Sequence, residues 1–218
     1  MALLSTYPLL YLIVRIFGFT STVTLIELSN TNSRILRRMS KEAQGTFIHS
    51  MQVANLAAEV ADKIGAKVQL VRTGALYRDI GKLSRPAFFT ENQTDVNPHE
   101  VLSEESSAQI IISHVTEGMK MAERYHLPRV ISDFIITHHG TGMAGYFHVQ
   151  SCNKHGEENV RKEDFTYPGR NPSTREQAIL MMADAIEAAS RSLKEYNEEH
   201  SNAPIQIKYA YILNEEAH

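Results

Sequence analysis

The chain has 218 residues, of which 43% are hydrophobic and 22% are charged, which predicts one soluble globular domain with a good-sized core. Its formal net charge of −3 at pH 7 gives no overall attraction to nucleic acid, so an anionic substrate would be held by local cations or metal ions. The single cysteine, Cys152, excludes an intrachain disulfide and permits a reducing compartment.

The first predicted element is an apolar stretch from Ala2 to Val14, which Arg15 interrupts. It is shorter than the ~20 residues that a membrane-spanning helix needs, and its basic residue follows the apolar run, unlike the order in a signal peptide. Two interpretations stay open: a core or interfacial helix, and the end of a membrane helix that begins before this sequence. Residues 29 to 46 follow as a polar, basic connector that carries a short helix.

Strong helical periodicity runs from Phe47 to Ile64, and His49 extends the apolar face of this helix by one turn. The imidazole of His49 should therefore point inward, either as a hydrogen-bonded core histidine or as a metal ligand.

The next helix carries Leu76-Tyr77-Arg78-Asp79-Ile80-Gly81-Lys82 and is expected to end at Gly81. Asp79 follows Val71 by eight residues and Ala75 by four, which predicts that its carboxylate lies on the buried face. Because a buried acid must be paired, hydrogen-bonded or bound to a metal, partners are expected elsewhere in the chain.

Three later segments offer such partners. After a long polar loop at residues 83 to 102, Ser103 begins a helix whose apolar stripe is bordered by His114. Another helix opens at Leu127-Pro128, and His138 and His139 close its last turn.

Residues 141 to 172 show no confident periodic element, and we interpret them as a candidate flap over a site. The capping-box spacing of Ser173-Thr174-Arg175-Glu176 then begins a helix in which five apolar residues precede Asp184. This run leaves no solvated face, so Asp184 is the second carboxylate predicted to be buried.

Six side chains with nitrogen or oxygen donors thus lie on or beside the apolar faces of separate helices, the arrangement by which a helical bundle builds a metal site in its core. One such residue alone would more often be a core histidine or a paired acid, but six on five inward faces are hard to explain as packing. Imidazole and carboxylate suit iron, manganese or zinc, and two ions about 3.5–4 Å apart can activate water against a phosphoryl ester. We therefore predict an all-α helical bundle that hydrolyses a phosphate ester. The six residues are His49, Asp79, His114, His138, His139 and Asp184.

The order of His49, Asp79 and Asp184 resembles that of the HD-domain metal phosphohydrolases. From about residue 8 to about residue 195, the chain resembles more narrowly the cytoplasmic domain of the seven-transmembrane HD proteins, which are PgpH-type cyclic di-AMP phosphodiesterases. The motifs that carry this resemblance include Glu-Leu-Ser-Asn at 27 to 30, Val53-Ala54-Asn55-Leu56-Ala57, Glu91-Asn92-Gln93, Asn97-Pro98-His99, His138-His139-Gly140-Thr141 and Ala188-Ala189-Ser190-Arg191-Ser192-Leu193.

The resemblance implies an HD phosphohydrolase domain over residues 29–218. It implies that residues 1–28 are the end of the last transmembrane helix and a juxtamembrane segment, which would place the domain at the cytoplasmic face of the bacterial inner membrane. A homodimer is left open.

The resemblance also implies two divalent ions, iron or manganese. One would be held by His49, Asp79 and Asp184, and the second by His114, His138 and His139, with Asp79 bridging. Catalysis would depend on Asp79 and on Lys82, which would steady the phosphate. Lys82, Asn92 and His99 would bind the nucleotide.

One position departs from the family pattern, because Arg78 stands where the family has a histidine immediately before the central aspartate. A guanidinium stays protonated and offers only donors, so it cannot ligate a metal, and the first ion would keep at most three protein ligands. Arg78 lies seven residues after Val71 and three after Ala75, which predicts that it faces the pocket and can pair with Asp79. The number of ions could thus fall to one.

Two classes of function follow. The first is an enzyme that hydrolyses a cyclic dinucleotide, with cyclic di-AMP favoured by the resemblance and another HD-type nucleotide phosphohydrolase as the alternative. The second is a catalytically inactive nucleotide-binding sensor, in which Arg78 replaces the charge of one metal. No basic patch with interleaved aromatic residues occurs, so neither DNA nor RNA is an expected partner.

Overall fold

A computed structural model of the protein describes residues 20–94 and 96–192. These residues form helices and no strand, apart from one isolated bridge between Met143 and Thr166, so the predicted all-α class is confirmed. The α-helices are α2 (Thr22–Leu28), α3 (Arg34–Glu42), α4 (Gln44–Lys63), α5 (Val68–Tyr77), α6 (Glu104–Arg124), α7 (Arg129–Thr137), α8 (Gly145–His155) and α9 (Arg175–Ser192). Short 3-10 helices are η1 (Ile80–Ser84), η2 (Pro86–Phe88), η3 (Thr90–Asn92), η4 (Pro98–Val101), η5 (Glu157–Asn159) and η6 (Lys162–Phe165).

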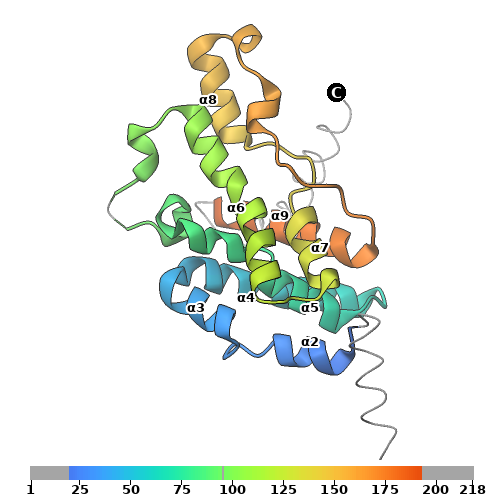
Figure 1. Cartoon of the computed structure of the whole chain (residues 1–218). Coiled ribbons are helices and arrows are strands. Elements are labelled where there is room, and N and C mark those ends of the chain that lie inside the picture. Colours follow the sequence, from blue (N-terminus) through green and yellow to red (C-terminus); the bar gives the residue numbers. More distant parts are fainter. Residues whose placement is uncertain (1–19, 95, 193–218) are drawn as a thin grey trace, which may run out of the picture.

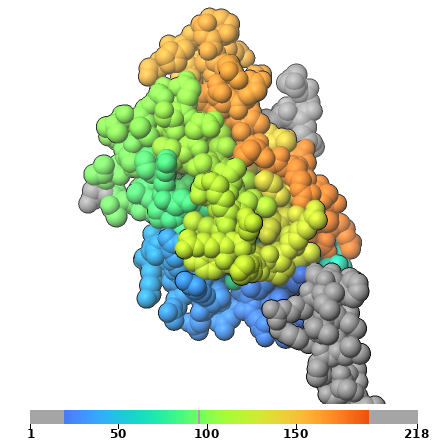
Figure 2. Space-filling view, viewed as in Figure 1, coloured from blue at the N-terminus to red at the C-terminus, as the bar shows by residue number. Residues whose placement is uncertain are grey.

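Helices α4 and α5 lie at the centre of the bundle, where α4 packs against α3, α5 and α9, and α5 packs also against α2 and α7. Figure 1 shows α2 and α3 at one end of the molecule and α8 at the other, with α6 running between them. The space-filling view shows the same order, with the segment around α8 forming a separate prominence at its end (Figure 2). The main core lies among α2 to α7 and α9, and a smaller apolar cluster lies under α8. The buried members of this smaller cluster are Ala108, Ile112, Ala144 and Phe165.

Three of the predicted helices carry candidate site residues. Helix α4 covers the predicted periodic segment and buries His49. Ser103 caps α6, because its hydroxyl accepts a hydrogen bond from the backbone N–H of Ser106 at 3.2 Å. At the start of α9 the cap lies one residue after the predicted Ser173: the Thr174 hydroxyl accepts from the N–H of Gln177 at 3.2 Å. Local capping chemistry thus sets where the helices carrying His114 and Asp184 begin.

The predicted end of the Asp79 helix was wrong. Helix α5 ends at Tyr77, and Asp79 lies in the turn before η1 rather than inside the helix, although it is still buried. Gly81 serves a different purpose from a helix stop, because a Cβ there would collide with the carbonyl oxygen of His114. The missing side chain lets η1 lie directly against α6, which brings Asp79 next to His114.

The sequence also led us to expect no periodic element in residues 141 to 172. That expectation was wrong, because this segment contains α8. Ser151 is the one buried residue of α8, whereas Tyr146 and Val149 are exposed, so the helix has no apolar stripe for the sequence to reveal. Its position depends on distant contacts, including a 2.6 Å hydrogen bond from the Ser151 hydroxyl to Glu105 on α6.

The predicted transmembrane end and juxtamembrane segment at residues 1–28 fall mostly outside the described residues. Within the described part of that segment, Thr22–Leu28 forms α2, which packs against α5 and buries Leu25. Among residues 20–94 and 96–192, no helix is both long enough and apolar enough to cross a membrane.

Candidate metal centre

The fold brings all six predicted donor residues to one place between α4, α6, α7 and α9. Their ligand atoms form two groups, in each of which the atoms lie within 4.8 Å of one another. One group contains His114, His138 and His139; the other contains His49, Asp79 and Asp184. These are the same two sets that the family resemblance implies.

We call the first part of the centre the histidine half; it consists of His114, His138, His139 and the Oδ1 atom of Asp79. The Nε2 atoms of His114 and His138 lie 3.1 Å apart, and they lie 3.5 and 3.6 Å from Asp79 Oδ1. The predicted proximity of His114 and His138 to Asp79 is thus present.

Two backbone carbonyls set the tautomers of these rings. The Nδ1 of His114 lies 2.6 Å from the carbonyl oxygen of Ile111, and the Nδ1 of His138 lies 2.8 Å from that of Ile135. A carbonyl can only accept, so each Nδ1 carries the proton and each Nε2 presents a lone pair. Two lone pairs therefore face Asp79 Oδ1, which is buried and has no hydrogen-bond partner. Three converging acceptors fit a metal cation.

The protonation states also suit a metal. Burial, with a contribution from the charge of His138, lowers the pKa of His114 from 6.5 to about 3. Burial likewise holds the pKa of His139 well below its ordinary value. For Asp79, burial alone would raise the pKa, but the charges of Lys82 and Arg78 outweigh it and hold the pKa well below its ordinary value. At neutral pH the centre thus presents neutral imidazoles at His114 and His139 and an ionised carboxylate at Asp79, the states that ligate metals.

We call the second part of the centre the arginine half; it consists of His49, Asp184, Arg78 and the Oδ2 atom of Asp79. Arg78 is fully buried, as its helical spacing predicts, with 0% of its surface exposed. Its Nη2 lies 2.7 Å from Asp184 Oδ1 and 3.2 Å from Asp79 Oδ2. Burial would raise the pKa of Asp184, but Arg78 and a hydrogen bond from His49 keep that pKa well below its ordinary value.

Glu187 is a member of the arginine half that the sequence interpretation missed. Its Oε2 lies 2.6 Å from Nδ1 of His49, while Nε2 of His49 lies 3.1 Å from Asp184 Oδ1. Glu187 follows Asp184 by three residues on α9, so the helical spacing places both carboxylates on one face. That spacing was the signal that could have found it.

Lys82 lies at the edge of the centre and joins it to the loop at η3. Its Nζ lies 2.8 Å from Glu91 Oε1 and 3.4 Å from Asp79 Oδ1. Glu91 also accepts a 2.9 Å hydrogen bond from the Thr46 hydroxyl. The amide of Asn92 binds Thr46 and the carbonyl of Pro86. These hydrogen bonds of Asn92 therefore hold the loop at η3 against the start of α4.

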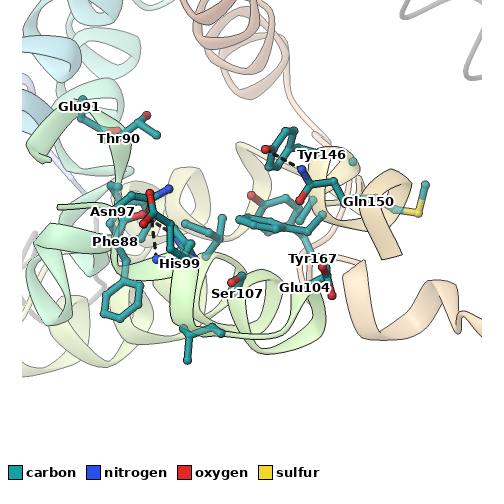
Figure 3. A pocket seen from close by; sticks show the side chains of 18 of the residues that line it. Phe88, Thr90, Glu91, Asn97, His99, Glu104, Ser107, Tyr146, Gln150 and Tyr167 are labelled. Carbon is teal, nitrogen blue, oxygen red and sulfur yellow. Dashed lines mark hydrogen bonds between the residues drawn. The ribbon is translucent and has the colours of Figure 1, made fainter. Parts of the chain in front are cut away.

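A cavity of 820 Å³ opens beside the centre, between the loop of η2 to η4, helix α6 and helix α8. In Figure 3, Phe88 and His99 lie on one side of this cavity, and Tyr146 and Tyr167 lie on the other. The His99 Nε2 lies 2.8 Å from the carbonyl oxygen of Phe88, which makes it the donor, and leaves Nδ1 as a buried acceptor without a partner.

Two aromatic side chains connect the cavity to the histidine half. The ring centroids of Phe89 and Tyr167 lie 5.8 and 6.0 Å from that of His114, and Tyr167 stacks on His139 at 4.3 Å. A molecule bound in the cavity would thus be next to the candidate metal ligands.

Comparison with known proteins agrees with this geometry. The family model of the HD domain matches residues 46–189, which include all six donor residues. The chain belongs to the HD-domain family. This HD domain is 44% identical over 181 residues to the cyclic-di-AMP phosphodiesterase PgpH of Listeria monocytogenes, and 43% identical over 184 residues to that of Bacillus subtilis. These matches cover 83% and 84% of the chain but 25% and 26% of the relatives, so the chain spans about a quarter of their length.

Two solved structures of the L. monocytogenes PgpH HD domain also match, each at 40% identity and over 86% of its own chain. The first has a TM-score of 0.76 and covers 84% of this HD domain. The second, in complex with cyclic-di-AMP, has a TM-score of 0.79 and covers 85% of it. The predicted likeness to the PgpH-type HD domain is confirmed.

The two halves differ in how well they fit a metal ion. The histidine half presents lone pairs and a carboxylate oxygen without a donor hydrogen-bonded to it. The arginine half has ligand-type side chains, but the guanidinium of Arg78 already contacts both of its aspartates. This HD domain therefore contains clusters that could bind metal, and they are not equivalent.

Proposed function

We propose that this HD domain hydrolyses a phosphodiester bond of a cyclic dinucleotide, with cyclic di-AMP as the substrate. The observation that carries the proposal is an aromatic-lined cavity of 820 Å³ whose lining residues Phe89 and Tyr167 pack against the histidines of the buried centre. The relatives at 43% and 44% identity are named cyclic-di-AMP phosphodiesterases, and a matching PgpH structure holds that ligand.

In this proposal Asp79, His114, His138 and His139 hold a divalent ion, iron or manganese, and the family pattern adds a second set in His49, Asp79 and Asp184. A bound ion would supply a Lewis acid for the phosphoryl oxygen and a water of lowered pKa. The backbone carbonyls of Ile111 and Ile135 keep the Nε2 atoms of His114 and His138 free of protons for this purpose.

Lys82 provides the positive charge for the phosphate. Burial would lower the pKa of Lys82, but Asp79 and Glu91 outweigh it and raise the pKa above its ordinary value, so the ammonium stays charged. Glu91 holds the ammonium 3.4 Å from Asp79 Oδ1, where it can stabilise negative charge that develops on a phosphoryl oxygen. Asn92 contributes to binding by fixing this loop.

The cavity supplies the means to bind the bases. Phe88, Tyr146 and Phe147 line it, and aromatic side chains of this kind stack on nucleobases. The unpartnered Nδ1 of His99 is an acceptor that suits the exocyclic amine of adenine, a donor group. This pairing would favour adenine over guanine, which presents a carbonyl oxygen at the corresponding position.

The test is hydrolysis of cyclic di-AMP and cyclic di-GMP by the protein loaded with manganese or iron under reducing conditions, with the linear dinucleotide separated by chromatography. We expect cyclic di-AMP to be the better substrate, and Arg78→His to be faster than the parent. Lys82→Gln should lose most of the activity, whereas Lys120→Gln, which changes a 71% exposed lysine, should not. Absence of turnover by both the parent and Arg78→His, with metal bound and folding intact, would count against this substrate.

A binding-only sensor is the second candidate, and the specific observation that favours it is the buried contact of Arg78 with Asp79 and Asp184. Tight binding of cyclic di-AMP without turnover by the parent, together with turnover by Arg78→His, would support the sensor. In either case we propose that the domain acts at the cytoplasmic face of a bacterial inner membrane, as part of a longer protein. A homodimer stays a prediction.

A further inference from the structure

We infer that the guanidinium of Arg78 permanently occupies the cation position of the arginine half, so that this HD domain binds one divalent ion, in the histidine half, instead of two. The inference rests on the proposed metal centre, but it does not depend on which substrate the centre hydrolyses.

The first support is the position of the guanidinium. A single atom, Nη2 of Arg78, contacts both carboxylates that would hold an ion in this half, Asp184 Oδ1 at 2.7 Å and Asp79 Oδ2 at 3.2 Å. The neighbouring Nη1 donates to the carbonyl oxygen of Ala75 at 2.9 Å. With 0% of its surface exposed, Arg78 is held from both sides and has no solvent-filled space to move into.

The second support is that the remaining ligand-type atoms of this half already have partners. His49 has one ring nitrogen 3.1 Å from Asp184 Oδ1 and the other 2.6 Å from Glu187 Oε2. A metal that bound His49 and Asp184 would have to displace these contacts as well as Arg78. In the histidine half, Asp79 Oδ1 has no hydrogen bond, and its nearest cation is the Lys82 ammonium at 3.4 Å, which lies closer to Glu91, at 2.8 Å.

The third support is the balance of charge around the centre. The two cations of the centre, Arg78 and Lys82, face four carboxylates, so these six side chains together carry two excess negative charges. One divalent ion would balance this excess, whereas two would make the buried centre positive by two charges. Even a single unit charge about 4 Å from a bound ion changes the affinity for that ion by up to about a thousandfold at an effective dielectric constant of about 20. The four carboxylates are Asp79, Glu91, Asp184 and Glu187.

The first experiment counts the ions in the absence of substrate. Metal-free protein is titrated with Mn²⁺ by calorimetry, and the washed complex is measured by elemental analysis. We expect one ion per chain in the parent and two in Arg78→His, which removes the cation and adds a ligand. Two ions in the parent, or one in Arg78→His, would overturn the inference.

Arg72→His is the matched control for this substitution. Arg72 lies on the same helix, α5, but is only half-buried, and its side chain donates to Asn55 at 2.8 Å, away from the metal centre. This variant should bind one ion, as the parent does. A second ion in Arg72→His would mean that the gain in Arg78→His is not specific to position 78, and the inference would fail.

The second experiment locates the single ion. His138→Gln should lower the affinity for Mn²⁺ by about 100-fold or more, since loss of even an outer-shell partner can cost that much. His49→Gln should leave the affinity within about twofold, because His49 belongs to the arginine half. Thermal unfolding of both metal-free variants checks that they fold. The reverse pattern, with His49 essential and His138 dispensable, would overturn the assignment.

These measurements separate the inference from the proposed function, because neither contains a nucleotide. A protein that binds one ion and fails to hydrolyse cyclic di-AMP keeps the inference and loses the substrate. A protein that hydrolyses cyclic di-AMP with two ions bound keeps the substrate and loses the inference.

Discussion

The histidine half and the arginine half draw on the same kinds of side chain, yet they present opposite surfaces to a cation. In the histidine half, two imidazole lone pairs converge on an aspartate oxygen that has no hydrogen bond. In the arginine half, a guanidinium already bridges two aspartates. Histidine and aspartate in the right places are therefore not sufficient for a metal site, because a single neighbouring cation can take the position of the metal.

Asp79 belongs to both halves, because its two carboxylate oxygens face different groups. Its Oδ1 faces His114 and His138, while its Oδ2 faces Arg78. Arg78 and Asp79 are consecutive residues directly after α5, so the same short stretch of backbone positions both the shared carboxylate and the competing charge. The difference between the halves thus depends on one side chain, and it can be tested by changing that side chain or the groups around it.

The largest expected effect comes from removing the charge in the arginine half. Arg78→Leu should lower the free energy of unfolding of the metal-free protein by about 3–5 kcal/mol, the cost of breaking a buried ion pair and leaving its partners unpaired. The partners here are Asp79 and Asp184, which would face each other without the guanidinium. Urea unfolding measures the change.

Arg72→Leu is the control for Arg78→Leu, because it removes the same side chain from the surface of the same helix. It should change the free energy of unfolding by no more than about 0.5 kcal/mol. If Arg78→Leu cost less than about 1 kcal/mol, the typical upper range of a surface pair, the guanidinium could not be the stabilising centre of its half.

A smaller effect is expected from pH in the histidine half. In the folded, metal-free protein the pKa of His114 is lowered to about 3, whereas an unfolded histidine takes up a proton near 6.5. Below pH 6.5 the unfolded state therefore binds more protons, and the free energy of unfolding should fall by about 1.4 kcal/mol per pH unit for this one residue.

Urea unfolding at pH 7, 6 and 5 measures this slope, and His139, whose pKa is also lowered, acts in the same direction. His114→Gln should flatten the dependence. His155→Gln, which changes an exposed histidine on α8, should show the same pH dependence of the free energy of unfolding as the parent. An equal slope in all three proteins would show that His114 is not held neutral in the metal-free fold.

The smallest expected effect is in the cavity, outside both halves. Tyr146 lines the cavity and is 70% exposed, so Tyr146→Ala should fold normally and lose one stacking surface. Loss of the stacking of one base on Tyr146 should weaken binding by about 1.4 kcal/mol, within the range for a stacked base. KM for cyclic di-AMP should therefore rise about tenfold, with little change in kcat. Steady-state kinetics measure both constants.

Val149→Ala is the control for the cavity, because Val149 is also exposed on α8 but does not line the cavity. It should leave KM unchanged. If Tyr146→Ala changed the affinity for Mn²⁺ instead of KM, the separation between the base-binding cavity and the metal centre would be wrong.

Much of the centre could be predicted from the sequence because helical periodicity alone decides which side of a helix faces inward. His114 and Asp184 are buried for this reason. Arg78 and Asp79 are also buried, as their spacing from Val71 and Ala75 predicted, although both follow the last residue of α5. Helical periodicity could not predict that Arg78 pairs with Asp184. These two residues are 106 positions apart, and their 2.7 Å contact depends on how α5 packs against α9.

The errors have the same physical origin. Helix α8 was missed because it is held by contacts with distant residues, such as the Ser151 bond to Glu105, and not by an apolar stripe of its own. The end of α5 was misplaced because Gly81 is required by its close approach to α6 instead of by the helix terminus. Local patterns predicted the faces of the helices correctly, while the contacts between helices determined the details of the site.

The most direct test of the unequal halves is the anomalous scattering of manganese in crystals of the metal-loaded protein, collected without nucleotide. We expect one peak per chain, about 2.0–2.3 Å from Nε2 of His114 and of His138, with the Arg78 guanidinium still between Asp79 and Asp184. A second peak beside His49 and Asp184, with Arg78 displaced, would contradict the account.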